Sequence, residues 1–523
     1  MRKHRTIFNN DGSFVLGNGI HGGRELTPAD AKDCVDLVAG TPVTSYFICT
    51  NFAMPFYPSR FERYAGSLDG VDSENGVSDE NLSPRATCHM QHGRQISALA
   101  REGTDIVGLC VERSHAHGLE AFASFRVNDL HQTDPAIDNP FEQGDFWRSH
   151  PECYVGGESQ GWNSRGALNF ACDAVREYKL NMIGEICERF GIDGLELDFM
   201  RFPVFFPSGE YEKNMPLMTG FVRDVRAITE SVGKKRGRPM ALCVRLPATP
   251  GMCSRKALDV KTYVADGLID FISLAAFFRD HPSLPVRALR EELGNNAIPV
   301  YACLDHAIVH PGTHGDYRAR AANRWREGAD GIYLFNFFFG SEGKLFCKAD
   351  VSDAARKEVR TGPSRELLAE LADAGSLLGR NKLYHAGVNK FQFGTDLPYD
   401  LPAVLPPGTV GKIDIELAEP AGCRPVRTVL FLRMASVSKN DAPDVTWNDA
   451  TVDPCTDREL PAAYGQMQML QEGQLVKAWE LPRGSLRDGV NTATIKGLPD
   501  RSCEISRAAV AVRYGAPSEC GYF

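Results

Sequence analysis

The sequence repeats one local pattern eight times between its N-terminus and about Leu378: a short apolar stretch with strand character, followed by a segment with helical periodicity. Alternating strands and helices are typical of parallel β/α construction, and eight such units are the number that closes into a barrel. We therefore predict an α/β fold built on a (β/α)8 TIM barrel. The predicted strands are Thr6–Asn9, Val43–Cys49, Glu120–Phe125, Gly194–Phe199, Met240–Arg245, Phe271–Ala275, Pro299–Cys303 and Gly331–Phe335.

A change of pattern marks a second domain. After a helix predicted around Ser364–Leu378, the chain turns to alternating strands separated by Pro and Gly, as in GTVGKIDIEL and VRTVLFLRM. This pattern is typical of a β-sandwich, and 523 residues are more than one core usually organises. We predict a barrel over residues 1–380 and a C-terminal β-sandwich accessory domain over residues 381–523. Because we identify no exposed aromatic platform for sugar in it, we expect the sandwich to brace the barrel.

Charge and composition exclude several classes of function. The formal net charge is −9, and no block of Lys or Arg offers a surface to phosphate backbones or anionic lipids. We therefore expect no nucleic-acid partner and no membrane partner, and no apolar stretch approaches the length of a membrane span. We expect a soluble protein of bacterial type, cytoplasmic as the sequence stands, with any export signal upstream of the first strand. The sequence leaves a homodimer open.

The sequence indicates neither a metal site nor a nucleotide cofactor. The fifteen Cys residues are dispersed and form no CxxC pair, and there is no P-loop and no GxGxxG after the first strand. Two histidine groups could suggest a metal: His306, His310 and His314, and the HxH pair His115 and His117. Pro311 interrupts any helix that would stack the first group, and the pair lies at the end of a predicted helix. We predict no metal and no cofactor.

Polar side chains gather where the predicted strands end, which is where catalytic groups of such barrels are found. Alternation along the fourth strand directs Leu195 and Leu197 to the helices and turns Glu196 and Asp198 into the barrel. Arginines at the mouth suggest an anionic substrate. The candidate site residues are Asn10, Asp11, Arg126, Asn128, Asp129, His131, Glu196, Asp198, Arg201, Arg245 and Asn336.

The roles of three of these residues stay open on the residues alone. Glu196 and Asp198 suit general acid/base cleavage of a glycosidic bond, but they also suit a buried ion-pair network with nearby arginines that only orients the barrel top. His131 follows Asp129 by two residues, and an adjacent carboxylate would favour its imidazolium form and make it a usable acid. A structural histidine is the alternative.

Two connections are far too long for simple turns: Thr50 to His92 after the second strand, and Asn128 to Gly166 after the third. Both lie at the C-terminal ends of the strands, where long loops are usually functional. They contain Tyr57, Phe61, Tyr64, Trp147 and Trp162. These aromatic side chains either line a sugar subsite or pack the loops against the barrel.

The stretches FNNDGSFVLG, FASFRVNDLH and GIDGLELDFMRFP resemble those of glycoside hydrolase family 156, inverting exo-sialidases on a (β/α)8 barrel. The resemblance covers the whole chain, and its first two motifs together are more specific than the third. It implies that His131 is the Brønsted acid and Asp11 the base of a single displacement on sialylated glycans, without a metal.

Charge supports a displacement by water. A sialic acid has a carboxylate on its anomeric carbon, which would repel a carboxylate nucleophile, whereas a water activated by Asp11 avoids that repulsion. One or more of Arg126, Arg201 and Arg245 would hold the substrate carboxylate. The sequence shows neither the repeated Asp-box turns nor the propeller of the more widespread sialidases.

Two other functions stay open. One is a different barrel glycosidase that uses Glu196 and Asp198 on neutral or uronic-acid glycans. The other is a non-catalytic carbohydrate-binding barrel, which would tolerate substitution of Asp11 or His131.

Overall fold

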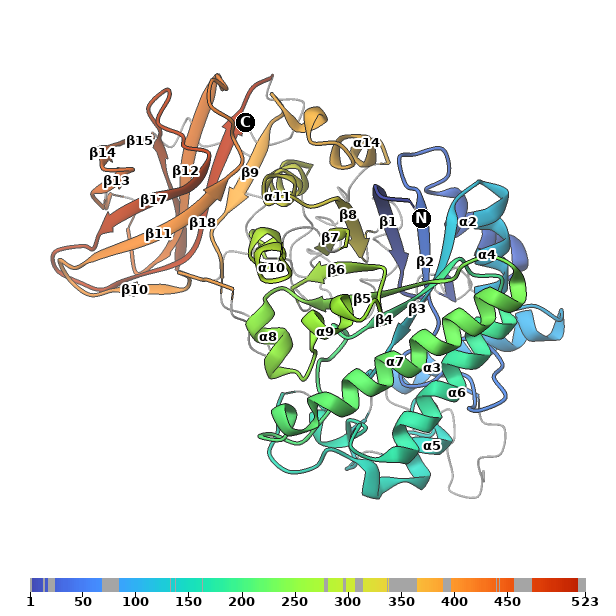
Figure 1. The fold of residues 1–523 in the computed structure, drawn as a ribbon. Helices are drawn as coiled ribbons and strands as arrows, with labels where there is room; N and C mark the ends of the chain where they lie inside the picture. The colour runs from blue at the N-terminus through green and yellow to red at the C-terminus, as the bar shows by residue number, and fades with distance from the viewer. Residues whose placement is uncertain are drawn as a thin grey trace.

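Eight parallel strands close into a barrel in chain order, with β1 paired to β8 (Figure 1). In this computed structural model the strands are β1 (Arg5–Asn10), β2 (Ser45–Cys49), β3 (Glu120–Arg126), β4 (Gly194–Asp198), β5 (Ala241–Pro247), β6 (Phe271–Ala275), β7 (Val300–Asp305) and β8 (Gly331–Phe335). The predicted fold class, a TIM barrel with a C-terminal sandwich, is confirmed. Each predicted strand boundary lies within two residues of the observed one.

The structure describes residues 2–12, 15–16, 24–67, 84–131, 133–136, 138–161, 163–276, 281–294, 298–305, 314–335, 337, 365–388, 397–438, 440–441, 443–455 and 473–515.

Helices between the strands cover the outside of the barrel. The first begins at a capping box, in which Thr27 accepts from the Asp30 N–H and the Asp30 carboxylate accepts from the Thr27 N–H at 2.8 Å. The helices are α2 (Pro28–Asp36), α3 (Pro84–Arg101), α4 (Ile106–Ala116), α5 (Asp145–Ser149), α6 (Asp173–Arg189), α7 (Tyr211–Arg236), α8 (Pro250–Arg255), α9 (Val260–Ala265), α10 (Val286–Glu292), α11 (His314–Arg326) and α14 (Leu367–Leu371).

Alternation divides each strand between two cores. On β4, Leu195 and Leu197 join the large apolar core between strands and helices, as predicted. The barrel interior has its own apolar cluster, in which Phe47 and Phe122 stack with ring centroids 4.4 Å apart. This apolar layer supports the polar side chains at the C-terminal ends of the strands.

The C-terminal part forms two antiparallel sheets that enclose a core containing Trp447 and Trp479. One sheet has the order β10-β18-β12-β16-β15, with β9 also paired to β18, and the other has the order β11-β17-β13-β14. The strands are β9 (Lys382–His385), β10 (Ala403–Leu405), β11 (Val410–Leu417), β12 (Arg427–Ala435), β13 (Val445–Trp447), β14 (Ala450–Thr451), β15 (Asp453–Pro454), β16 (Gln474–Glu480), β17 (Gly489–Lys496) and β18 (Cys503–Arg513).

The sandwich lies against α11 on the outside of the barrel, and its strand β9 runs beside this helix (Figure 1). Arg326 on α11 bridges to Glu416 at 2.8 Å and to Asp488 at 3.0 Å, and the His281 ring contacts the Pro398 carbonyl at 2.8 Å. These contacts join the two domains, and the bracing role stays a prediction. The domain limit at residue 380 stays a prediction, between the end of β8 and the start of β9.

In the part of the chain that the structure describes, no helix is both long enough and apolar enough to cross a lipid bilayer.

Candidate active site

Four strand ends bring charged side chains together in the barrel mouth. Asp11 directly follows β1, Arg126 ends β3, Asp198 ends β4 and Arg245 lies on β5. All four are buried, and buried charges are costly unless they are paired. Each of them is accordingly found in an ion pair. The sequence-based expectation that these positions converge therefore agrees with their placement.

Asp129 is the centre of the first cluster. Its Oδ1 accepts from the backbone N–H of His131 at 2.8 Å and from Nδ1 of the same residue at 2.5 Å. Its Oδ2 accepts from Nη1 of Arg126 at 3.1 Å. Nη2 of Arg126 lies 4.0 Å from a carboxylate oxygen of Asp11, and Nε2 of His131 lies 3.4 Å from Nη2 of Arg201. The contacts thus run continuously from Asp11 to Arg201.

The hydrogen bond to Asp129 determines the tautomer of His131. A carboxylate only accepts, so Nδ1 of the neutral imidazole has the proton and Nε2 is the acceptor. Burial lowers the pKa of His131 below its usual value. Asp129 opposes this shift, whereas Arg201 and Arg126 reinforce it. The predicted contact with a carboxylate is present, but it does not produce a stable imidazolium in the free protein, because burial and the two arginines outweigh it.

Burial alone would raise the pKa of Asp129, but His131 and the arginines outweigh burial and hold this pKa well below its usual range. Asp129 is therefore an anion at any pH at which the protein would work.

Two asparagines hold the loop that positions this cluster. Asn51 after β2 accepts from the Arg126 N–H at 3.1 Å and donates to the Arg126 carbonyl at 3.0 Å. Asn128 donates from Nδ2 to the carbonyls of Leu168 and Val204, at 2.8 and 2.6 Å. We predicted Asn128 as a substrate contact, but its amide hydrogens bind the backbone. Asn128 therefore anchors the loop after β3 to the neighbouring backbone.

Arg245 is the centre of the second cluster. Its Nη1 donates to Asp198 at 3.2 Å and its Nη2 to Asp305 at 3.3 Å, and its guanidinium lies 4.0 Å from the centre of the Phe335 ring. The Asp198 carboxylate also accepts from the backbone N–H groups of Met200, at 2.9 Å, and Arg201, at 3.1 Å. This is the buried network that was the alternative to a catalytic role for Asp198, and it orients the segment with Arg201.

Glu196 lies deeper in the barrel. Its Oε1 accepts from Ser124 at 2.7 Å and from the hydroxyl of Tyr333 at 2.8 Å. Burial, with repulsion from Asp198, raises the pKa of Glu196 to about 8, so the carboxyl is neutral at pH 7. Within the described ranges, Oε2 of Glu196 is buried without a hydrogen-bond partner.

The prediction for Asn10 needs correction. Its Nδ2 donates to the Tyr46 hydroxyl at 2.9 Å, and its Oδ1 accepts from the Gly12 N–H at 3.0 Å. Tyr46 belongs to the core between strands and helices, so Asn10 faces away from the barrel interior. Asn9 points inward instead, with Nδ2 2.7 Å from the Tyr333 hydroxyl. Strict alternation along β1 would have identified Asn9.

Asn336, Trp162, His306 and His310 lie outside the described residues. The other histidines of the two groups lie apart: His115 contacts Asp193 at 2.8 Å, His117 contacts Asp36 at 2.6 Å, and His314 begins α11. Among the residues that the structure describes, no three His, Cys, Asp or Glu side chains gather in a way that could hold a metal ion.

Two of the five loop aromatics pack the loops. Tyr57 is buried edge-on against Phe190, with ring centroids 5.2 Å apart. Trp147 stacks on Tyr154 and donates from Nε1 to the Gly166 carbonyl at 2.7 Å. Phe61, in contrast, is 43% exposed. The packing interpretation therefore accounts for Tyr57 and Trp147.

No protein-family model matches this sequence, and no curated protein matches it. Among solved structures, the chain is similar to a cycloisomaltooligosaccharide glucanotransferase from Paenibacillus sp. at 10% identity, covering 97% of this chain and 57% of that one, with a TM-score of 0.32. It is also similar to the PgaB (BpsB) glycoside hydrolase domain from Bordetella bronchiseptica at 11% identity, covering 69% of this chain and 100% of that one, with a TM-score of 0.38.

A third similar structure is α-L-fucosidase isoenzyme 2 from Paenibacillus thiaminolyticus at 12% identity, covering 71% of this chain and 48% of that one, with a TM-score of 0.39. The chain spans about half the length of the glucanotransferase and of this fucosidase. Likenesses this distant carry no argument about function, which must come from the residues of the site.

We predict that Glu196→Gln flattens the pH dependence of stability. The pKa of Glu196 is about 8 in the folded protein, against about 4.3 in an unfolded chain, so folding favours the protonated form. This contribution is fully present below the unfolded pKa and is lost as the pH rises through the folded pKa. Between pH 5.5 and 8.5, the free energy of unfolding of the variant should gain about 2–3 kcal/mol relative to wild type.

Urea unfolding at both pH values measures this difference. The exposed Glu177→Gln on α6 serves as the control and should run parallel to wild type. A constant difference between Glu196→Gln and wild type over this range would contradict a protonated Glu196.

Proposed function

We propose that this protein is a glycoside hydrolase, an exo-sialidase that removes terminal α-2-linked sialic acids from glycans by an inverting single displacement. The observation that carries the proposal is the continuous set of contacts from Asp11 through Arg126 and Asp129 to His131. Arg126 and Asp129 stand between the proposed base and the proposed acid in this chain of contacts. An inverting mechanism needs separated acid and base groups, because a water must fit beside the base.

The arginines favour an anionic substrate, and their partners suggest which of them bind it. Both Nη groups of Arg245 are occupied by Asp198 and Asp305. Nη2 of Arg126 is buried and forms no hydrogen bond within the described residues. A substrate carboxylate would supply the missing acceptor for Arg126. Arg201, beside Nε2 of His131, is positioned to share that carboxylate.

In the proposed step, the oxygen of a water attacks the anomeric carbon while Asp11 accepts one of its protons. The bond between the anomeric carbon and the glycosidic oxygen breaks, and that oxygen takes the proton of Nε2 of His131. Asp129 accepts from Nδ1 throughout and stabilises the imidazolium that donates. A substrate anion bound to Arg126 and Arg201 would cancel charges that disfavour the imidazolium, so substrate binding would promote protonation of the acid.

The structure offers less support for the alternative glycosidase that uses Glu196 and Asp198. Asp198 already accepts from Arg245 and from two backbone N–H groups, and Glu196 is buried against Ser124 and Tyr333. Both carboxyls have partners that fix the barrel top.

We predict that Asp11→Asn lowers kcat by about 10²–10⁴-fold on both an aryl α-2-linked sialoside and sialyllactose, because water attack loses its base. His131→Asn should lower kcat by a similar factor on sialyllactose but much less on a nitrophenyl sialoside, whose leaving group needs little protonation. Release of free sialic acid measures both effects.

Two matched controls accompany these variants. Asp33→Asn changes an exposed carboxylate on α2, and His150→Asn changes a histidine of the same long loop that stacks on Phe146. Both should retain wild-type rates. No sialic acid release by the wild-type protein, or full activity in Asp11→Asn and His131→Asn, would contradict the proposal.

We predict an acidic pH optimum with a limb determined by His131. Because the pKa of His131 is lowered, kcat/KM should fall as the pH rises through a value below about 6.5. Asp129→Asn removes the charge that raises this pKa and should move the limb to lower pH. Arg201→Gln removes a charge that lowers it and should move the limb to higher pH. A limb that stays in place in both variants, or that moves in the same direction in both, would rule out His131 as the titrating acid.

A further inference from the structure

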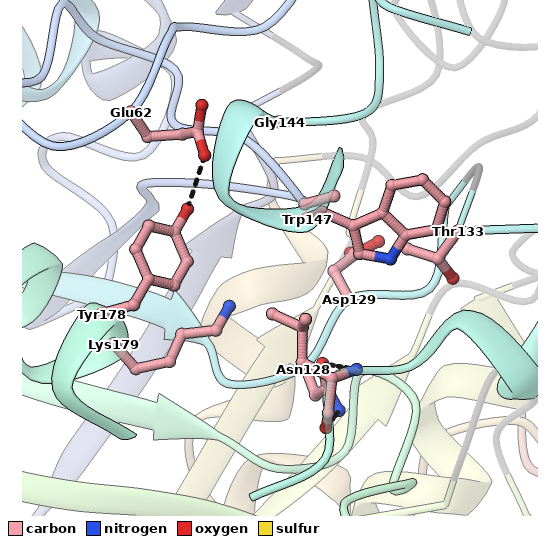
Figure 2. Close-up of a pocket in the computed structure, with 10 residues that line it drawn as sticks. Glu62, Asn128, Asp129, Thr133, Gly144, Trp147, Tyr178 and Lys179 are labelled. Carbon is pink, nitrogen blue, oxygen red and sulfur yellow. Dashed lines mark hydrogen bonds between the residues drawn. The ribbon is translucent and has the colours of Figure 1, made fainter. Parts of the chain in front are cut away.

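Lys179 is a buried cation that the proposed reaction does not use. It lies on α6, its side chain is 4% exposed, and its Nζ points into a small cavity behind Asp129 (Figure 2). Glu62, Asp129 and Thr133 are among the other residues that line the cavity. Its volume of about 10 Å³ is room for one water molecule and not for a sugar.

The ammonium group of Lys179 is poorly satisfied. Among the described residues, none lies within hydrogen-bond or ion-pair distance of Nζ, which lies instead over the rings of Tyr178 and Phe125, with centres 5.5 and 5.7 Å away. Burial lowers the pKa of Lys179 to about 8, although Asp129 and Glu62 oppose the shift. A lysine held in this way costs stability, so stability does not explain why it is there.

Two carboxylates face this ammonium group, and one of them already has other partners. Glu62 accepts from the backbone N–H groups of Asp145, at 2.8 Å, and Phe146, at 3.1 Å, and from the Tyr178 hydroxyl at 3.1 Å. Figure 2 shows the bond from Tyr178 to Glu62 above Lys179. Glu62 therefore fixes the start of α5. Asp129, on the other side, is the carboxylate that holds His131.

We propose that Lys179 is a positioning residue for the pair of Asp129 and His131, and that its charge lowers the proton affinity of His131 across the cavity. The catalytic role of Lys179 rests on the proposed function, whereas the titration of His131 that tests its charge effect does not. Lys179 acts on Asp129 from α6, on the cavity side, whereas Arg126 acts from β3. Arg126 binds the carboxylate directly, and Lys179 would reach it from the opposite side through one water in the cavity.

The direction of the effect follows from the charges that face each group. His131 faces Asp129, which favours the imidazolium, and Arg201 and Arg126, which disfavour it. Lys179 adds a third positive charge near the pair, facing Asp129 and Glu62. Removing this charge should raise the pKa of His131 by about half a pH unit or more.

The test is an NMR titration of the His131 ring in protein labelled at histidine, with the signal assigned by its loss in His131→Asn. Lys179→Met should raise the pKa of His131, and the charge-retaining Lys179→Arg should restore it toward wild type. Lys256→Met is the matched control, because Lys256 is another lysine whose pKa burial lowers to about 8, but it lies at the end of α8. It should leave His131 unchanged.

Should Lys179→Met fail to fold, Lys179→Gln gives the same neutral position with a polar side chain. An unchanged His131 pKa in a folded neutral variant, or an equal rise in Lys256→Met, overturns the proposal. In the sialidase assay, the alkaline limb of kcat/KM should move upward with the NMR value. A rise seen by NMR in a protein that releases no sialic acid would support the role of Lys179 and reject the proposed function, so the two failures are distinguishable.

Discussion

Asp129 organises the barrel mouth because its carboxylate accepts from two side chains of different function. One oxygen binds Arg126 at the end of β3, and the other binds both the backbone and the ring of His131. Desolvation alone would raise the pKa of this buried carboxylate, but His131, together with Arg126 and Arg201, keeps it charged. The position of the proton on His131, the orientation of its Nε2 and the placement of Arg126 beside Asp11 all follow from that one charged group.

The barrel mouth contains two networks of charged side chains, one centred on Asp129 and one on Arg245. In the cluster of Asp129, Nη2 of Arg126 has no hydrogen-bond partner among the described residues, and the His131 ring lies next to Arg201; in the proposed function these groups bind and protonate the substrate. In the cluster of Arg245, both Nη groups are paired with carboxylates, and Asp198 also accepts from the backbone N–H of Arg201. The second network supports the first because Asp198, at the end of β4, accepts from the backbone N–H of Arg201 and so positions Arg201 beside His131.

The sequence predicts the barrel well because its signals are local. Strand patterns, glycine stops and the alternation that turns Glu196 inward depend on neighbours along the chain. The site is predicted less completely, because partners distant in the sequence decide it. Asn10 was misplaced although alternation alone would have selected Asn9, whereas the pairing of Arg245 with Asp305 and the backbone bonds of Asn128 depend on contacts that no local pattern contains. The protonation of His131 depends on burial, which a neighbouring aspartate in the sequence does not reveal.

In the proposed mechanism, water attacks the anomeric carbon directly, without a covalent intermediate, with Asp11 as the base and His131 as the acid. Proton NMR of the wild-type protein acting on an α-2-linked sialoside tests it most directly, because it identifies the anomer of sialic acid that is released before mutarotation. A single displacement by water predicts that the β-anomer appears first. Initial release of the α-anomer would show retention and contradict a single displacement, and with it the roles of Asp11 and His131.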